Sequence, residues 1–163
     1  MNISPRVCLF RLGTQLFALP GEYTRQVHTV SNLRPVPKAP AILRGLFPVR
    51  SNVLPLVSLE PLLGIDTAPL LGMDAGPESA PLEYELAVQM EFEGRELAFG
   101  ITEVIGFNPL ERSTLKPVPL GMGQIRELSL GVFLHEGESV LMLDVEKLMM
   151  ALSRAFGVVR VVA

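Results

Sequence analysis

One eleven-residue segment of this chain occurs twice. Residues 53–63 (VLPLVSLEPLL) align without a gap on residues 139–149 (SVLMLDVEKLM). In both copies an apolar run ends at a residue that favours helix N-termini, Ser58 in the first and Asp144 in the second. An apolar-Glu-x-apolar-apolar sequence follows, which predicts a helical turn. The repeat therefore indicates a strand followed by a short helix, built twice.

A second, shorter repeat lies upstream of each copy, where Gly13–Ala18 matches Gly94–Phe99. Two copies of a unit are too few for a solenoid, in which three or more repeats stack. We therefore expect one domain that contains two similar β units with a cleft between them, drawn roughly from residues 7–65 and 83–157. Residues 66–82 hold three Pro, two Gly and mostly small side chains, so we expect a linker there.

Short apolar runs interrupted by Pro and Gly predict many strands and tight turns. The chain has 14 Pro and 14 Gly, dispersed between the apolar runs. A short helix should start after Ser58 and end at Gly64, and a longer one should run from Asp144 to Gly157. Short strands with brief helices are typical of an all-β fold, as barrels or a sandwich. The expected strands are residues 6–12, 15–19, 27–33, 42–49, 53–57, 85–92, 95–101, 102–107, 128–135 and 139–143.

Charge is divided unevenly along the chain. Residues 1–65 carry seven Lys and Arg against two Glu, a net charge of +5, whereas residues 66–163 carry seven against fifteen acidic residues, a net charge of −8. Two faces of opposite potential would select different partners, and scattered surface charge is the alternative. The basic residues are isolated and lack interleaved aromatic side chains, so no nucleic acid is expected as a partner.

The apolar segments are too short for a membrane or a signal peptide. None approaches the ~20 residues of a membrane helix, and only four apolar residues follow Pro5 and Arg6. The single cysteine, Cys8, lies within that short apolar run and is expected to be a buried thiol. These features favour a cytoplasmic protein without direct membrane insertion.

No motif for catalysis, cofactor binding or metal binding is recognisable. A Walker loop, a dinucleotide glycine fingerprint and a nucleophile elbow are all missing. His28 and His135 have no second His or Cys at ligand spacing. We therefore expect no enzymatic activity, no cofactor and no metal. The alternative is a small-ligand-binding β-barrel or hydrolase that uses the cleft between the units, with Glu103 or Asp144 as its acid.

The order of several weak motifs resembles the CheW-like chemotaxis adaptors. Residues 10–20 (FRLGTQLFALP) are similar to the opening strand pair of that family, and residues 35–40 to its proline segment. The family's most recognisable block is a Gly-containing strand, an Asn-x-Arg-Gly turn, an apolar strand with Pro, and Asp-Leu. Coverage runs from Val7 to Met150. The further matching segments are residues 42–46, 49–59, 100–106 and 141–148.

The resemblance implies two intertwined small β-barrels with a hydrophobic groove between them and no catalysis. It implies a scaffold that couples a methyl-accepting chemotaxis receptor tip to the regulatory domain of a CheA-type histidine kinase, in chemotaxis or pilus-based motility. The receptor's helical hairpin would dock in the groove. Such a cytoplasmic adaptor would be recruited to receptor arrays at the membrane. A detached kinase regulatory domain is a third interpretation, although the chain starts at Met1 and has no ATP-binding motif.

Carried over by position, the resemblance implies partner-binding roles for eight residues. Five of them belong to the groove, two to the strand that approaches the kinase, and one to the Asn-x-Arg-Gly turn. In that order they are Thr24, Arg25, Gln26, Val27 and Ile101, then Leu43 and Gly45, then Arg50. The chain departs from the family pattern where Gln26 replaces Glu, Thr24 replaces an apolar residue, Pro48 replaces Asn, and Ser58 and Thr102 replace Asp.

Overall fold

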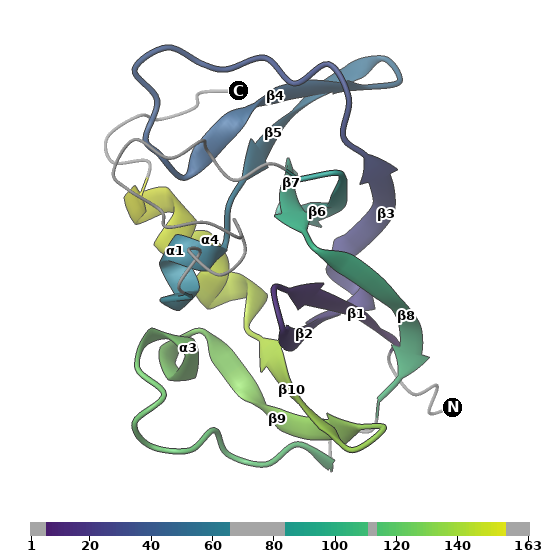
Figure 1. The fold of residues 1–163 in the computed structure, drawn as a ribbon, viewed down its shortest axis with the longest axis vertical. Coiled ribbons are helices and arrows are strands. Elements are labelled where there is room, and N and C mark those ends of the chain that lie inside the picture. Colours follow the sequence, from purple (N-terminus) through teal and green to yellow (C-terminus); the bar gives the residue numbers. More distant parts are fainter. Residues whose placement is uncertain (1–5, 66–83, 111–113, 156–163) are drawn as a thin grey trace.

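The computed structural model describes residues 6–65, 84–110 and 114–155, most of which form two five-stranded β-sheets (Figure 1). Sheet A contains, in spatial order, β8 (Glu103–Pro109), β1 (Arg6–Leu12), β2 (Gln15–Pro20), β10 (Glu138–Leu143) and β9 (Ser129–His135). Sheet B contains β3 (Thr24–Thr29), β6 (Leu86–Phe92), β7 (Arg95–Ile101), β5 (Asn52–Val57) and β4 (Leu43–Val49). This confirms the expected mainly-β class. Within the described ranges both sheets are open, because no pairing joins β8 to β9 or β3 to β4.

The helices are short, as expected, and they are α1 (Glu60–Leu63), α3 (Gln124–Glu127), α4 (Val145–Ala155) and a 3-10 turn at Gly21–Tyr23. Asp144 starts α4, because its Oδ1 accepts the Lys147 N–H at 3.2 Å. The expected cap at Ser58 was wrong: Leu59 occupies the N-cap of α1 without a side-chain bond. Gly64 ends α1 at a φ of 70°. No described helix has the length and apolar character needed to cross a membrane.

Each sheet takes strands from both halves of the chain. In sheet A, the first hairpin of the N-terminal half (β1–β2) pairs with the third strand (β8) and the last hairpin (β9–β10) of the C-terminal half. In sheet B, the first hairpin of the C-terminal half (β6–β7) pairs with the third strand (β3) and the last hairpin (β4–β5) of the N-terminal half. The junctions are the two parallel pairings, β2 with β10 and β5 with β7. The two sheets therefore have the same strand order and interlock. They do not coincide with the sequence segments 7–65 and 83–157 that we expected to form the two units.

The strand pairing shifts the alignment of the shorter repeat, Gly13–Ala18 with Gly94–Phe99, by one residue. Both first hairpins have a two-residue turn, so Gln15 after the β1–β2 turn is equivalent to Arg95 after the β6–β7 turn. Phe17 is then equivalent to Leu97, and both belong to the same core cluster. Aligning Gly13 with Gly94 would instead match Leu16 with Leu97, which lie on opposite faces, as a one-residue slip requires.

Three hydrophobic clusters hold the sheets together. The central cluster lies between them and includes Phe10 of sheet A and Phe99 of sheet B, whose ring centroids are 5.2 Å apart. One face of α4 completes it with Val145, Leu148 and Leu152. The other face of each sheet carries its own cluster. Cys8 is buried in the central cluster, which raises the pKa of its thiol to about 12.

Candidate partner-binding surface

Four of the eight expected partner-binding residues lie on β3, an edge strand of sheet B. Arg25 and Gln26 are exposed, Val27 is half-buried at the margin of the central cluster, and Thr24 is buried. The Thr24 hydroxyl donates to the carbonyl of Gly21 at 3.1 Å, so it holds the preceding turn. β3 starts at Thr24 instead of the expected residue 27, because the 3-10 turn occupies only Gly21–Tyr23. The strand therefore presents three of these side chains, at Arg25, Gln26 and Val27.

Burial removes Ile101 and Gly45 from direct contact with a partner. Ile101 is 1% exposed and belongs to the central cluster, which fills the seam where we expected an apolar groove. Gly45 is buried under the chain that crosses β4: a Cβ there would lie 2.6 Å from the carbonyl oxygen of Arg34. Leu43 is half-buried against the central cluster.

Arg50 lies apart from the β3 residues, at the tip of the β4–β5 hairpin. It occupies the first turn position with a φ of 54° and is exposed. β3 and β4 are the opposite edge strands of sheet B, with β6, β7 and β5 between them. The expected site therefore divides into two surfaces, the β3 edge with Arg25, Gln26 and Val27, and the hairpin tip with Arg50.

Exposed apolar side chains outside the eight expected residues lie beside Arg50 on the β4–β5 hairpin. Leu46 and Val53 face outward from β4 and β5 with exposures of 37% and 60%, while Phe47 and Leu54 face the sheet B cluster. A separate exposed apolar side chain lies on the β9–β10 hairpin of sheet A, where Leu134 is 71% exposed. The exposed apolar residue of β4 could have been found from the sequence, because β4 is apolar at consecutive positions instead of alternating.

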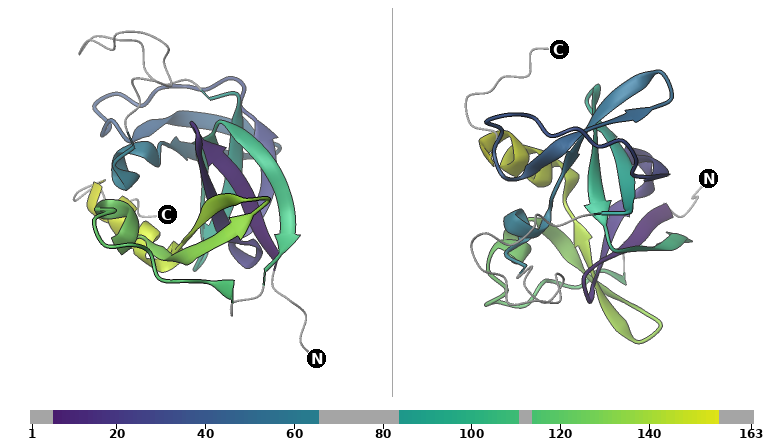
Figure 2. Two further views of the ribbon diagram at one scale, coloured as in Figure 1. Left: turned by 60° about the horizontal axis from the view of Figure 1, so that its bottom comes forward. Right: turned by 45° about the horizontal axis from the view of Figure 1, so that its top comes forward.

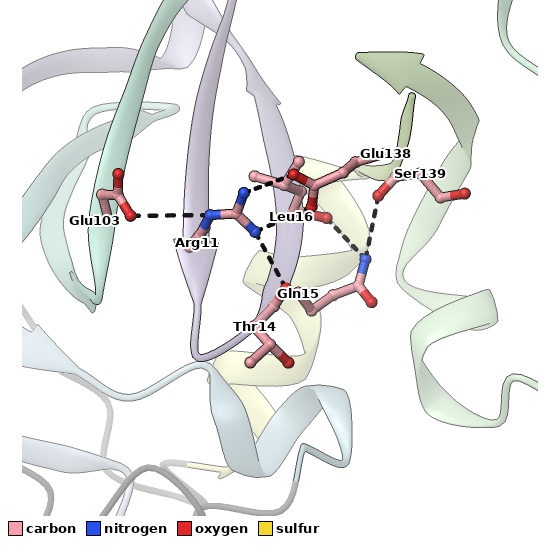
Figure 3. Close-up of polar contacts among 7 residues, drawn as sticks. All are labelled: Arg11, Thr14, Gln15, Leu16, Glu103, Glu138 and Ser139. Atoms are coloured by element: carbon pink, nitrogen blue, oxygen red, sulfur yellow. Dashed lines mark hydrogen bonds and ion pairs between the residues drawn. The ribbon is translucent and has the colours of Figure 1, made fainter. Parts of the chain in front are cut away.

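An ion-paired arginine joins three strands at one end of sheet A (Figure 3). Arg11 of β1 donates to both carboxylate oxygens of Glu138 on β10, at 2.8 and 3.1 Å, and its Nε lies 3.8 Å from Glu103 on β8. The hydrogen bonds from Arg11 lower the pKa of Glu138. In sheet B, Arg25 lies 3.2 Å from Glu91 and lowers the pKa of that carboxyl in the same way. The two arginines therefore favour the ionised forms of Glu138 and Glu91.

A buried carboxyl group lies where α1 meets the start of β6. Glu60 is 0% exposed, and the Tyr84 hydroxyl is 2.6 Å from its Oε1 and 3.0 Å from Ser58 Oγ. Its Oε2 has no hydrogen-bond partner among the described residues. Burial raises the pKa of Glu60, and the bond from Tyr84 opposes this. No sequence motif marks this cluster, since Tyr84 comes from a segment separate from the one that holds Ser58 and Glu60.

Two cavities open at the surface of the described part of the chain. One of about 600 Å³ opens beside the sheet A cluster, with Val7, Leu9 and Phe133 among its apolar lining and Lys116 and His135 among its polar lining. A second, of about 360 Å³, lies between the β6–β7 turn and α4. Neither is lined by Glu103 or Asp144, the acids of the alternative hydrolase interpretation.

The side chains that could bind a metal are scattered in the described part of the chain. No group of three or more His, Cys, Asp and Glu residues comes together there. His28 Nε2 lies 2.7 Å from Gln89 Oε1, so the ring is engaged within sheet B. The geometry thus offers exposed edges and hairpin faces for contact with other proteins.

Comparisons with known proteins agree with this architecture. The sequence model of the CheW-like domain family matches residues 6–153. A curated protein of Treponema pallidum (strain Nichols), "Chemotaxis protein CheW", is 34% identical over 50 residues, which are 31% of this chain and 29% of that protein. The crystal structure of the scaffolding protein TtCheW from Thermoanaerobacter tengcongensis superposes with a TM-score of 0.71 at 15% identity, covering 91% of this chain and 89% of that one.

Proposed function

The chain belongs to the CheW-like domain family, and on this premise we propose that it is a non-enzymatic scaffold that couples chemoreceptors to a CheA-type histidine kinase. The pathway would be chemotaxis or pilus-based motility. The observation that carries the proposal is the extent of the family match, because residues 6–153 contain every strand of both sheets. Recruitment to receptor arrays would follow from receptor binding.

The β3 edge is the surface that we assign to the receptor tip. A helix that docks there would set apolar positions against Val27, and Gln26 beside it would offer a polar contact at the rim. Arg25 is already paired with Glu91, so its charge is partly neutralised within sheet B. Such a contact is small and reversible, which suits a signal that shifts a kinase equilibrium by ~1–3 kcal/mol.

The β4–β5 hairpin is the surface that we assign to the kinase regulatory domain. Its outward face presents Leu46 and Val53 around the exposed Arg50. An apolar centre beside an exposed arginine is the composition in which binding energy concentrates at protein interfaces. Leu43 and Gly45 support this hairpin from beneath and do not form the contact itself.

Reconstitution with the kinase and a receptor signalling fragment from the same organism tests the proposal. Adding the chain should raise kinase autophosphorylation above that of kinase and receptor alone, and the three proteins should sediment together. Val27→Glu should release the receptor and retain the kinase, whereas Val53→Glu should do the reverse. Both positions are partly or largely exposed, so each variant should fold.

Ser153→Glu is the matched control, because it adds the same charge at an exposed position of α4, away from both surfaces. It should behave like the wild type in both assays. Failure of the wild-type chain to bind either protein would disprove the proposal. Equal loss of both partners in each variant would disprove the separation into two surfaces.

A further inference from the structure

The cavity of about 600 Å³ opens beside the sheet A cluster. Figure 2 shows that sheet A is curled, and residues of both its edge strands, β8 and β9, line this one cavity. The apolar lining includes Val7, Leu9 and Phe133, which belong to the sheet A cluster. Pockets that bind small molecules usually measure ~300–1,000 Å³, so the cavity has the size of a ligand site.

The equivalent place in sheet B is occupied by two polar side chains. His28 Nε2 lies 2.7 Å from Gln89 Oε1, and both residues are half-buried. The His28 ring lies edge-on to Phe47, with ring centroids 6.4 Å apart. The pair therefore packs beside the sheet B cluster, to which Phe47 belongs.

Strand register identifies the residues that replace this pair in sheet A. Counted from the two-residue turn of each first hairpin, Leu9 of β1 is equivalent to Gln89 of β6. Asn108 of β8 is equivalent to His28 of β3, because each pairs with the residue two positions before these in the neighbouring strand. Leucine cannot make the hydrogen bond of Gln89, and asparagine is smaller than histidine and has no ring. The two replacements leave space, and both line the cavity.

Phe133 is the sheet A residue that an aromatic ligand would contact. It is equivalent to Phe47 by the register of the last hairpins, and each phenylalanine belongs to the cluster of its own sheet. Within the described ranges no aromatic ring contacts Phe133, whereas the His28 ring contacts Phe47. A ligand ring in the cavity would supply the missing edge-on contact, which aromatic pairs favour.

Lys116 adds a positive charge to the cavity lining. It is equivalent to Arg34, because each forms an isolated bridge to the last hairpin of its sheet. The Lys116 side chain is exposed and makes no ion pair with the described residues. His135 also lines the cavity, and the carboxylate of Glu138, which interacts with His135, is already paired with Arg11. The polar part of the lining therefore favours an anion.

We propose that the sheet A cavity binds a small aromatic carboxylate, with its ring beside Phe133 and its carboxylate near Lys116. Burial of the ring against the apolar lining provides the affinity. The exposed charge of Lys116 contributes less and sets the orientation of the ligand. Both surfaces that we assign to the receptor and the kinase lie on sheet B, so this site on sheet A goes beyond the proposed function.

A titration of 2-naphthoate with the full-length chain, followed by fluorescence anisotropy, tests the proposal. The chain has no Trp, so the naphthalene emission is measured without interference from it. The wild type should bind 2-naphthoate saturably and shift the amide NMR signals of Leu9 and Phe133. The neutral 2-naphthalenemethanol should bind about threefold more weakly. Lys116→Glu should weaken 2-naphthoate about tenfold, because repulsion replaces attraction, and leave the alcohol unchanged. A misfolded variant would lose both compounds.

Arg34→Glu is the matched control, because it makes the same charge change at the equivalent exposed position of sheet B. It should bind both compounds as the wild type does. Asn108→His should weaken both compounds alike, since it returns a ring to the place that His28 occupies in sheet B. Absence of saturable binding by the wild type would overturn the proposal. Equal affinities of Lys116→Glu and the wild type for 2-naphthoate, or NMR shifts confined to residues outside the cavity, would overturn it too.

Discussion

Replacing the buried carboxyl of Glu60 by an amide (Glu60→Gln) should stabilise the protein at neutral pH and change little near pH 4. Glu60 is 0% exposed, and the Tyr84 hydroxyl lies 2.6 Å from its Oε1. Its Oε2 has no partner within the described residues. Burial raises the pKa of Glu60, and the Tyr84 hydrogen bond and the charge of Arg44 oppose that rise only in part.

The direction of the pH dependence follows from proton linkage. The folded-state pKa lies above the unfolded value of about 4.3, so the folded protein holds the proton between the two values. The stabilisation from Glu60 is therefore fully present below the unfolded pKa and is lost as the pH rises through the folded pKa. The amide of the Glu60→Gln variant does not ionise, so its contribution does not change with pH. A buried carboxylate with an unpartnered oxygen costs more free energy than a neutral amide at the same place, so we expect a gain of about 1–2 kcal/mol at pH 7.

Urea unfolding across this pH range measures the effect. With a slope of about 2 kcal/mol per molar urea, a gain of that size raises the midpoint by about 0.5–1 M. Glu146→Gln is the control, because Glu146 holds the equivalent position of the repeat on α4 but is exposed. This control variant should leave the urea midpoint unchanged near pH 4 and at pH 7. A Glu60→Gln difference that is constant with pH, or that shrinks as the pH rises, would refute the reasoning.

Four further predictions follow from the described contacts. Tyr84→Phe removes the hydroxyl shared by Glu60 and Ser58 and should cost about 1–3 kcal/mol in urea unfolding at pH 7; an unchanged midpoint would show that the bonds do not form. Gly45→Ala places a Cβ 2.6 Å from the Arg34 carbonyl oxygen and should cost more than ~2 kcal/mol in thermal unfolding, whereas Gly137→Ala, with open space but a φ of 82°, should cost about 1 kcal/mol. Arg11→Met should return the pKa of Glu138 to its ordinary range in a carboxyl NMR titration. Because the pKa of Glu138 is depressed in the wild type, the small stabilisation that the ion pair provides is lost as the pH falls. A titration identical to that of the wild type would exclude the Arg11 contact in solution. Fragments 1–72 and 73–163 should each remain unfolded alone and fold when mixed, as circular dichroism would show, because each sheet needs strands from both; a fragment that folds by itself would contradict the interlocked topology.

Local features of the fold could be predicted from the sequence, but the pairing of distant strands could not. The repeat at residues 53–63 and 139–149 became β5 with α1 and β10 with α4, because apolar runs are local signals, although only Asp144 caps its helix as expected. The exchange of hairpins between the sheets depends on the parallel pairing of β2 with β10 and β5 with β7. No feature within a strand indicates which distant strand it pairs with in parallel. The two sheets therefore do not correspond to the two halves of the sequence.

The exposure of the site residues was predictable only where charge or a turn fixes it. Arg25, Gln26 and Arg50 are exposed because a strand edge and a hairpin tip face solvent. Ile101 lies at the end of an apolar strand, and its burial results from the packing of sheet A against sheet B. The Glu60 cluster was missed for the same reason, since Tyr84 reaches it from a distant segment.

The two copies of the unit share residues where backbone geometry leaves no choice. Gly45 and Gly131 occupy equivalent positions, and a Cβ at either would lie 2.6 or 2.8 Å from the carbonyl oxygen of a crossing segment. Phe47 and Phe133, two residues further on, both fill the cluster of their own sheet.

Surface positions carry no such constraint, and there the copies differ in the sign of their charge, as at Arg50 and Glu136. Two identical units would present the same surface at both ends and could not distinguish one neighbour from another. Charge reversal on a common backbone gives each end its own preference. It follows that Arg50→Glu should weaken the binding of a partner that recognises the basic tip and leave unchanged the binding of a partner that recognises the acidic tip, as a pull-down with each partner would measure.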